Sequence, residues 1–228
     1  MIDMRKIHVL GIDFTDYTLR EGMKKVDEYL RDGKVSSIGY ITTKGLMEAN
    51  DTPAMKEWME SLDLAIPADA DILRAAGVES MGRIREVEEN LFIKEFLKKA
   101  AKGRRSIFLL AETREQMGSL SKTLLGYQEH LKIVGTYAME ELQADEDYVV
   151  NEINIAAPEI LISQLPSPRR ETFYENNKMK LNTEVWLMLK AGMIIGDQHK
   201  NLMYRFYDNI IKKMFRHRVM HFEKETDE

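Results

Sequence analysis

The stretch Arg104-Arg-Ser-Ile-Phe-Leu-Leu-Ala-Glu-Thr113 decides the fold, together with the residues that follow it. Its apolar run 106–110 has the length of a buried strand. Thr113 is followed three residues later by Gln116, which is a capping-box pattern, and apolar residues then recur at helical spacing. A second strand pattern covers 132–134. This order predicts a β-α-β unit with two neighbouring parallel strands and a right-handed crossover.

Strand and helix patterns alternate along most of the chain. We therefore predict the α/β class, with a mostly parallel, Rossmann-like sheet flanked by helices. Such a sheet is covered on both faces, and ligands bind beyond the carboxyl ends of its strands. Further strands are expected at 36–41, 62–66, 159–164 and 184–189, and a strand or small hairpin at 6–14.

The chain is predicted to have two parts. Residues 1–196 form the α/β domain, and residues 197–228 form a basic amphipathic helical appendage. Within the domain we expect a polar connection at 77–85 and an amphipathic helix at 87–101.

Composition excludes several classes of protein. With 44% apolar and 31% charged residues, the 228-residue chain fits a globular protein. The absence of cysteine excludes disulfides and thiolate chemistry, and it suits a reducing cytoplasm. A net charge of −5 argues against general nucleic-acid binding. We expect no signal peptide, because Met1–Arg5 leads straight into a strand pattern. We expect no membrane-spanning helix, because no run approaches the roughly 20 apolar residues that a span needs.

Four stretches carry a family resemblance. Each follows a family pattern, in the same order and at matching separations from about Lys6 to Gly196. They are Leu62-Asp-Leu-Ala-Ile-Pro67 (A-D-L-V-L-P-D-G), Ile107-Phe-Leu-Leu110 (V-F-L-L-G-G), Leu131-Lys-Ile-Val-Gly-Thr136 (L-x-I-V-G-T) and Pro158-Glu-Ile-Leu-Ile-Ser-Gln-Leu-Pro-Ser-Pro-Arg-Arg-Glu171 (P-D-I-L-F-V-G-L-G-A-P-K-Q-E). The chain thus resembles the WecG/TagA/CpsF glycosyltransferases, glycosyltransferase family 26.

The resemblance implies an activity and a set of partners. It implies cytoplasmic enzymes, peripheral at the inner face of the membrane, that act in cell-surface polysaccharide synthesis. They transfer a hexosamine-type sugar from a UDP-sugar to a polyprenyl-diphosphate-linked acceptor, with inversion and with no cofactor or bound metal. The expected partners are both substrates, the membrane surface through the C-terminal helix, and a second copy or another glycosyltransferase. Nucleic acid is not expected.

The catalytic candidate is displaced from the family pattern. The family aspartate of P-D-G, the proposed general base, falls on Ala68, and Asp69 comes one residue later. A base must come within roughly 3 Å of the acceptor hydroxyl, directly or through a water. A shift of one residue at a strand end turns a side chain to the other face. Asp69 is therefore the catalytic candidate only with a reshaped loop.

Other family positions supply the binding candidates. The T-x-N turn corresponds to residues 42–44, and the arginine of R-V-x-G corresponds to Arg85. The two arginines near the end of the fourth stretch can clamp a phosphate. The substrate-binding candidates are Thr42, Thr43, Arg85, Arg169, Arg170 and Glu171.

The departures from the pattern favour a second hypothesis. Glycines that would let backbone N–H groups approach a diphosphate are replaced by Ala111-Glu112. Pro166 removes a further donor, and a late glycine-rich block survives only as Lys190-Ala-Gly-Met193. The alternative is a catalytically inactive member that acts as a scaffold or regulatory partner of an active glycosyltransferase. A generic nucleotide-binding module has less support, since neither G-x-G-x-x-G nor a P-loop is present.

Two further patterns each have two interpretations. Asp69-Ala-Asp71 is a D-x-D, which can hold Mg²⁺ or Mn²⁺, but acidic residues also favour a helix N-terminus, and the metal-independent family favours the latter. The C-terminal helix has an apolar stripe beside basic residues, typical of a membrane-interface helix or of one docked on protein. The stripe comprises Met203, Phe206, Tyr207, Ile210, Ile211, Met214 and Phe215.

Overall fold

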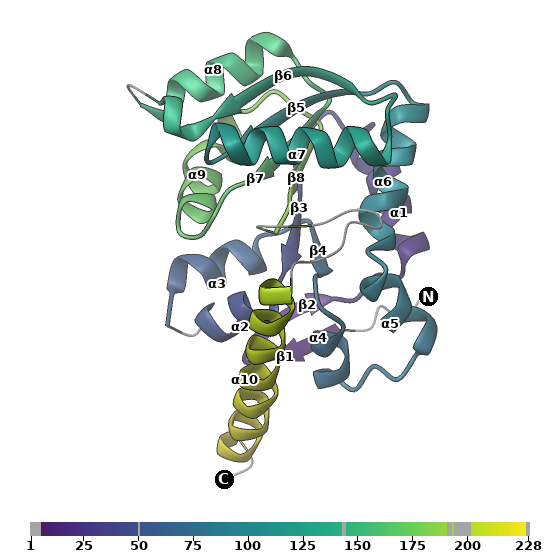
Figure 1. Cartoon of the computed structure of the whole chain (residues 1–228), viewed down its shortest axis with the longest axis vertical. Coiled ribbons are helices and arrows are strands. Elements are labelled where there is room, and N and C mark those ends of the chain that lie inside the picture. The colour runs from purple at the N-terminus through teal and green to yellow at the C-terminus, as the bar shows by residue number, and fades with distance from the viewer. Residues whose placement is uncertain (1–5, 50, 143–144, 191–192, 194–201, 227–228) are drawn as a thin grey trace.

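A computed structural model describes residues 6–49, 51–142, 145–190, 193 and 202–226. Six strands form one sheet in the order β4-β3-β8-β7-β5-β6, and every pairing in it is parallel (Figure 1). The prediction of an α/β fold with a mostly parallel sheet is confirmed. The strands are β3 (Ser36–Ile41), β4 (Leu64–Pro67), β5 (Ser106–Ala111), β6 (Lys132–Ala138), β7 (Ile160–Gln164) and β8 (Val185–Met188).

The β-α-β unit predicted from the sequence is confirmed. β5 and β6 are parallel neighbours joined by α7 (Arg114–Tyr127), and the Thr113 side chain accepts a hydrogen bond of 3.2 Å from the Gln116 N–H. β6 is longer than expected and carries a register shift. Gly135 is required there, because a Cβ atom would lie 2.5 Å from the ring of Phe108.

Helices cover both faces of the sheet. Inward side chains such as Phe96 and Leu124 pack on one face, and others such as Phe173 and Trp186 pack on the opposite face. The first face is covered by α1 (Leu19–Tyr29), α6 (Leu91–Lys102) and α7. The second is covered by α2 (Thr43–Ala49), α3 (Pro53–Glu60), α8 (Glu146–Ala156) and α9 (Arg169–Asn177). Two short 3₁₀ helices are η1 (Met139–Glu141) and η2 (Lys178–Lys180).

A separate antiparallel hairpin precedes the sheet. It consists of β1 (Lys6–Val9) and β2 (Ile12–Thr15), which confirms the small hairpin expected at 6–14. Thr18 then caps α1 through a complete capping box with Glu21.

The connection expected at 77–85 is wrong. Ser80 accepts a hydrogen bond from the Arg83 N–H and so starts α5 (Met81–Glu88), which follows α4 (Ala70–Ala75). The next helix begins at 91 rather than 87, because Asn90 has a left-handed φ of 52° and separates α5 from α6. Apolar periodicity alone had placed residues 87–101 in one helix. The Ser80 cap and left-handed Asn90 instead assign 87–88 to α5 and start α6 at residue 91.

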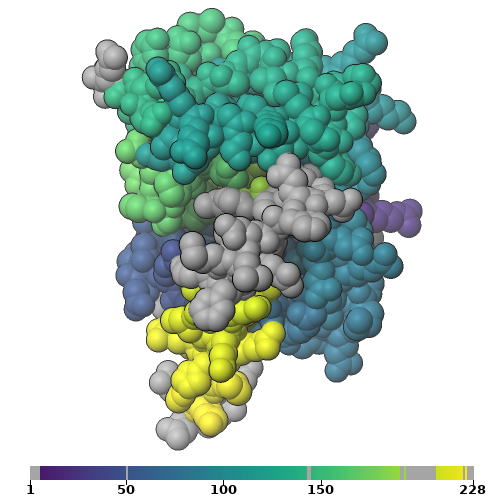
Figure 2. Space-filling model, in the orientation of Figure 1, coloured from purple at the N-terminus to yellow at the C-terminus, as the bar shows by residue number. Residues whose placement is uncertain are grey.

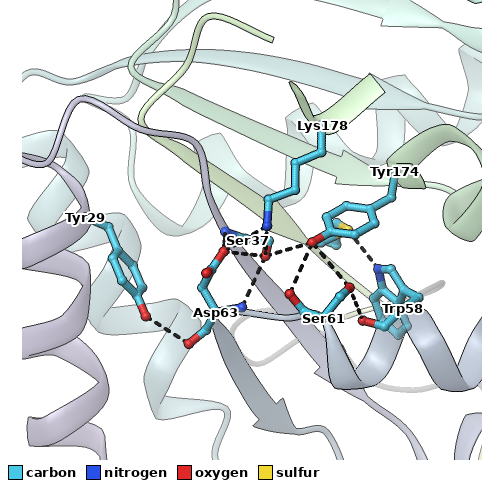
Figure 3. A network of polar contacts seen from close by, with 8 residues as sticks. Tyr29, Ser37, Trp58, Ser61, Asp63, Tyr174 and Lys178 are labelled. Carbon is cyan, nitrogen blue, oxygen red and sulfur yellow. Dashed lines mark hydrogen bonds and ion pairs between the residues drawn. The ribbon is translucent and has the colours of Figure 1, made fainter. Parts of the chain in front are cut away.

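Two clamps of one kind close the N-terminal edge of the sheet. In the first, which we call the Ser37 clamp, the Ser37 N–H and Oγ–H both donate to Asp63 Oδ2, at 2.8 and 2.7 Å. The Asp63 N–H returns a hydrogen bond of 3.2 Å to Ser37 Oγ. Lys178 Nζ lies 3.1 Å from the Asp63 carboxylate, and the Tyr174 hydroxyl donates to Ser37 Oγ (Figure 3). Neighbouring strands β3 and β4 are thereby tied at their starts.

The second clamp repeats this arrangement between β5 and β7. The Ser106 N–H and Oγ–H donate to Glu159 Oε2 at 2.8 and 3.3 Å, and the Glu159 N–H returns 3.0 Å to Ser106 Oγ. Arg105 Nη1 pairs with the other carboxylate oxygen. We call this group the Ser106 clamp.

The C-terminal helix α10 (Leu202–Thr226) docks on the rest of the chain. Phe215 is fully buried in the core, and Val219 and Phe222 pack beside it. Arg216 Nε and Nη2 lie 2.9 and 2.7 Å from Asp71 Oδ1. Its contacts are with α2 and α4, and in Figure 2 it projects at the lower end of the surface. The docked interpretation thus holds for the Phe215 side.

The rest of the predicted apolar stripe on α10 has a different environment. Ile210 and Met214 are exposed, while the side chains of Met203, Phe206 and Tyr207 lie outside the described residues. Within the part of the chain that the structure describes, no helix has the length and apolar character needed to cross a membrane.

Candidate functional site

Asp69 and Thr43 meet at the C-terminal ends of β3 and β4. Asp69 Oδ2 accepts hydrogen bonds from the Thr43 N–H at 3.1 Å and from its hydroxyl at 3.4 Å. Ala68, at the family aspartate position, is buried in the core, and the next residue turns its side chain toward Thr43. Thr42 has a different role, because its hydroxyl accepts from the Gly45 N–H at 2.9 Å and caps α2. Of these candidates, the structure brings Thr43 and Asp69 together.

Lys190, two residues beyond the end of β8, joins this pair, and it was not among the site residues predicted from the sequence. Its Nζ lies 3.2 Å from the Ala68 carbonyl oxygen and 3.5 Å from Asp69 Oδ1. Its own carbonyl accepts 3.0 Å from the Gln164 amide at the end of β7. The lysine stem therefore crosses the end of β3, which lies between β8 and β4. The available signal was its place directly after the expected strand 184–189.

Arg169 and Glu112 occupy the point where the sheet connections diverge. β5 leads to α7 on one face, and the neighbouring β7 leads to α9 on the opposite face. In doubly wound sheets such a switch point opens the ligand crevice. Arg169 Nε lies 3.3 Å from Glu112 Oε2, so the arginine proposed to bind phosphate is already paired with a carboxylate. Glu112 therefore competes with a phosphate for the Nε side of this guanidinium, and the Arg169 side chain is 42% exposed.

Arg170 and Glu171 form a buried unit at the start of α9. Arg170 Nε lies 3.0 Å from Glu171 Oε1, and its guanidinium carbon lies 3.9 Å from the centroid of the Trp58 ring. Glu171 is only 3% exposed, and its Oε2 has no hydrogen-bond partner among the described residues. Arg170 is therefore committed to Glu171 and Trp58 rather than being open to solvent.

The arginine that faces inward from α5 is Arg83 rather than Arg85. The Arg85 side chain is 74% exposed and pairs with Glu89 on its own helix, so the structure does not bring it to Asp69. Arg83 is buried, with Nε and Nη2 at 2.9 and 2.8 Å from Asp16 Oδ1, and it shares a small cavity with Pro67. Residues two apart on a helix lie on nearly opposite sides. The sequence analysis missed Arg83 because it had placed no helix there.

The comparison with known proteins bears on the whole sheet. The model of the glycosyl transferase WecG/TagA/CpsF family matches residues 7–195, which include the six strands of the parallel sheet and all the residues of this site. The chain belongs to this family. No curated protein gives a significant match. Membership in the WecG/TagA/CpsF family implies nucleotide-sugar and lipid-linked acceptor substrates, and the resemblance read from four short stretches is confirmed.

The D-x-D of this WecG/TagA/CpsF member does not act as one unit. Asp69 contacts Thr43, whereas Asp71 is 4% exposed and holds Arg216 of α10. Asp71 lies in the first turn of α4, where an acidic side chain favours the helix N-terminus. Among the described residues, no three His, Cys, Asp or Glu side chains are grouped so that they could hold a metal ion.

A groove of about 720 Å³ runs between α2 and α10. Lys44, the residue that follows Thr43 in α2, is one of its lining residues. Met47, Ile210, Ile211 and Met214 give it an apolar lining. Lys44, Lys213 and Arg218 contribute positive charge, and Glu48 and Asp51 contribute negative charge.

Proposed function

We propose that this protein is an inverting, metal-independent glycosyltransferase. It transfers a hexosamine-type sugar from a UDP-sugar to a polyprenyl-diphosphate-linked acceptor in cell-surface polysaccharide synthesis. The observation that carries the proposal is the meeting of Asp69, Thr43 and Lys190 at adjacent strand ends, in a chain that belongs to this family. One carboxylate base beside a cation suits a single displacement at a sugar carbon.

In the proposed reaction Asp69 is the general base. Its carboxylate takes the proton of the acceptor hydroxyl as that oxygen bonds to C1 of the sugar. The bond from C1 to the diphosphate oxygen breaks, and its electron pair leaves with UDP. Attack on the face opposite the leaving group inverts C1. Thr43 orients the carboxylate through its N–H and hydroxyl.

The other candidates have supporting roles in this proposal. Thr42 holds the start of α2, and Arg169 contacts the diphosphate after leaving Glu112. Arg170 and Glu171 stiffen the floor of the site through their buried pairing. Arg85 receives no role at Asp69, because its guanidinium pairs with Glu89 in solvent.

The groove between α2 and α10 supports a peripheral location at the inner membrane face. Its apolar lining and positive charge suit a lipid-linked diphosphate that approaches from an anionic lipid surface. We expect the full chain to sediment with anionic liposomes and a chain truncated after residue 201 to lose most of this binding. Equal sedimentation of both would contradict a membrane role for α10.

Calorimetric titration with UDP and a panel of UDP-N-acetylhexosamines tests the donor site. Binding tighter than about 1 mM, near −4 kcal/mol, supports the transferase and justifies a transfer assay. The titration is repeated with Mn²⁺, and affinity that depends on the metal would contradict the metal-independent mechanism. Absence of binding to every nucleotide would contradict the proposal.

A specific observation favours the inactive scaffold as a second function. Both arginines placed to receive phosphate already face carboxylates, Arg169 at Glu112 and Arg170 at Glu171. The double variant Asp69→Ala, Arg170→Ala separates the two functions. An enzyme should lose turnover, whereas a scaffold should keep its binding to an active glycosyltransferase in a pull-down measurement.

A further inference from the structure

We propose that Lys190 exchanges between Asp69 and the diphosphate of the donor, so that donor binding uncovers the catalytic carboxylate. This inference rests on the proposed transferase function and adds an order to it, with the donor first and the acceptor second. It assigns Lys190 two states, one in contact with the base and one in contact with phosphate.

The contact between Lys190 and Asp69 is long for an ion pair. Its Nζ lies 3.5 Å from Asp69 Oδ1, which is longer than a charge-assisted hydrogen bond of about 2.7–2.9 Å. The Lys190 side chain is 20% exposed and that of Asp69 is 12% exposed, so the pair is reachable from solvent. An ion pair of this kind contributes little energy, and leaving it is correspondingly cheap.

Lys190 also has a central position in the sheet. β8 lies between β3 and β7, so Lys190 starts near the middle of the C-terminal edge. The Gln164 amide holds its carbonyl at 3.0 Å, which fixes the backbone while the side chain can move. From this anchor the flexible stem reaches Asp69 beyond β3, and β7, which borders the switch point, lies on the other side. A lysine ammonium is a compact charge suited to such a change of partner.

To act as a base, Asp69 needs one carboxylate oxygen that is free to accept a proton. Thr43 occupies Oδ2 with two hydrogen bonds, and Lys190 faces Oδ1. While Lys190 faces Oδ1, that oxygen is not free to accept a hydrogen bond from the acceptor hydroxyl. When Lys190 moves to a phosphate oxygen, Oδ1 can accept the proton of the acceptor hydroxyl. The lysine then also offsets the charge that develops on the leaving UDP.

The two arginines at this edge, Arg169 and Arg170, cannot couple donor binding to the release of Asp69. Arg169 is paired with Glu112, and Arg170 is paired with Glu171 beneath Trp58. Neither has a contact with Asp69 among the described residues. Lys190 touches the candidate base directly, so its departure changes the base.

Calorimetric titration of the full chain with UDP tests the exchange. The variants are Lys190→Met, Lys190→Arg, Asp69→Asn and the double variant Lys190→Met, Asp69→Asn. Lys56→Met, which removes an exposed lysine paired with Glu60 on α3, is the matched control. Thermal unfolding of each variant establishes that it is folded.

The exchange predicts effects of opposite sign. Lys190→Met should weaken UDP binding about tenfold or more, and Lys190→Arg should keep part of the affinity. Asp69→Asn should bind UDP about 2- to 5-fold more tightly than the unaltered chain, because the lysine no longer leaves a carboxylate. The double variant should bind as weakly as Lys190→Met, and Lys56→Met should bind normally.

Each contrary result overturns a defined claim. If the unaltered chain binds UDP and Asp69→Asn binds no more tightly, the exchange is wrong while the transferase proposal stands. If Lys190→Met binds normally, the phosphate contact is wrong. If the unaltered chain binds no UDP at all, the transferase proposal and the exchange both fail.

Discussion

At the N-terminal edge of the sheet, Ser37 and Asp63 share hydrogen bonds of 2.7, 2.8 and 3.2 Å, whereas at the C-terminal edge Thr43 and Asp69 share bonds of 3.1 and 3.4 Å. Both pairs join β3 to β4, and in both the N–H and hydroxyl of one residue donate to a single carboxylate oxygen. The chemical groups are alike, but the first pair includes a return bond from the carboxylate residue and is tighter.

The difference separates a structural contact from an exchangeable one. The Ser37 side chain is fully buried, and Tyr174 and Lys178 complete the Ser37 clamp. Asp69 instead has longer contacts, at 3.1 and 3.4 Å to Thr43 and 3.5 Å to Lys190, although its side chain is less exposed than that of Asp63. A carboxylate held by short, reciprocal hydrogen bonds fixes the strands, while one held by longer contacts can change partners when a ligand arrives. The same side-chain chemistry thus serves stability at one edge and is available for binding at the other.

The largest effect that tests this contrast is on turnover. We expect Asp69→Asn to lower sugar transfer about 10²- to 10⁴-fold, the contribution of a general base, with little change in stability. Asp63→Asn, the matched change at the other edge, should leave turnover per folded molecule nearly intact. A transfer assay with urea denaturation of both variants measures this. Equal loss of turnover in the two would remove the distinction between the edges.

A smaller effect is expected on stability. Ser37→Ala and Ser106→Ala should each lower the free energy of unfolding by about 1–3 kcal/mol, because each removes one donor from a carboxylate and the acceptor of one backbone N–H. The clamps join different strand pairs, so the double variant should show a nearly additive loss. Urea unfolding is the measurement, and Thr43→Ser, which keeps both donors, is the control. A loss below 0.5 kcal/mol, roughly the effect of an ordinary surface change, would contradict the role of the clamps.

The sequence predicted the fold well, for an identifiable reason. Strand 106–110 and the Thr113 cap are local features, because their signals lie within a few residues. The same reasoning failed at α5, where Ser80 starts a helix and left-handed Asn90 ends the connection to α6. Those two events depend on single residues, and periodicity averaged over a window does not detect them.

The site was harder to predict because it depends on contacts between distant parts of the chain. Asp69 was selected through its motif position, and Thr43, 26 residues earlier, proved to be its partner. Lys190 reaches Asp69 only because β8 inserts between β3 and β7, and strand order is not readable from the sequence. Arg85 was selected by alignment to a motif, yet Arg83 is the arginine turned inward.

Acidification should reveal the Ser37 clamp through the pKa of Asp63. Burial raises this pKa, but the hydrogen bonds from Ser37 and Lys178 outweigh burial and hold it below the usual value. A lowered folded-state pKa gives stability that is present above the unfolded-state pKa, near 4, and is lost as the pH falls through the folded-state value.

The measurement compares the unaltered chain with Ser37→Ala at several pH values. The difference in unfolding free energy should shrink by about 0.5–1 kcal/mol between pH 6 and pH 3, a modest amount because the carboxylate is partly exposed. Asp13→Asn, a change at an exposed aspartate outside the clamp, serves as the control. A constant difference across this range would mean that the clamp does not act through Asp63.

The smallest expected effect concerns Glu184, which shares Arg105 with Glu159 in the Ser106 clamp. Burial raises the pKa of Glu184; Arg105, whose Nη1 lies 3.7 Å away, opposes this shift, and neighbouring Glu159 adds to it. A raised folded-state pKa gives stability that is present below the unfolded-state pKa and is lost as the pH rises through the folded-state value. At pH 7 the ionised Glu184 is therefore a net cost. Glu184→Gln should raise the unfolding free energy by less than about 0.5 kcal/mol at pH 7 and by nothing below about pH 4.

Glu159→Gln is the matched opposite of that change. Burial raises the pKa of Glu159, but the hydrogen bonds from Ser106 and Arg105 outweigh burial, and the net pKa lies below the usual value. The ionised form of Glu159 therefore stabilises the fold. This variant should lose stability at pH 7, and the loss should fade on acidification. Urea midpoints for both variants at pH 7 and pH 4 decide between the signs. A loss of stability in Glu184→Gln would show that Arg105 stabilises both carboxylates. The N-terminal edge would then hold a network of Arg105, Glu159 and Glu184, rather than an Arg105–Glu159 pair beside an unfavourable Glu184.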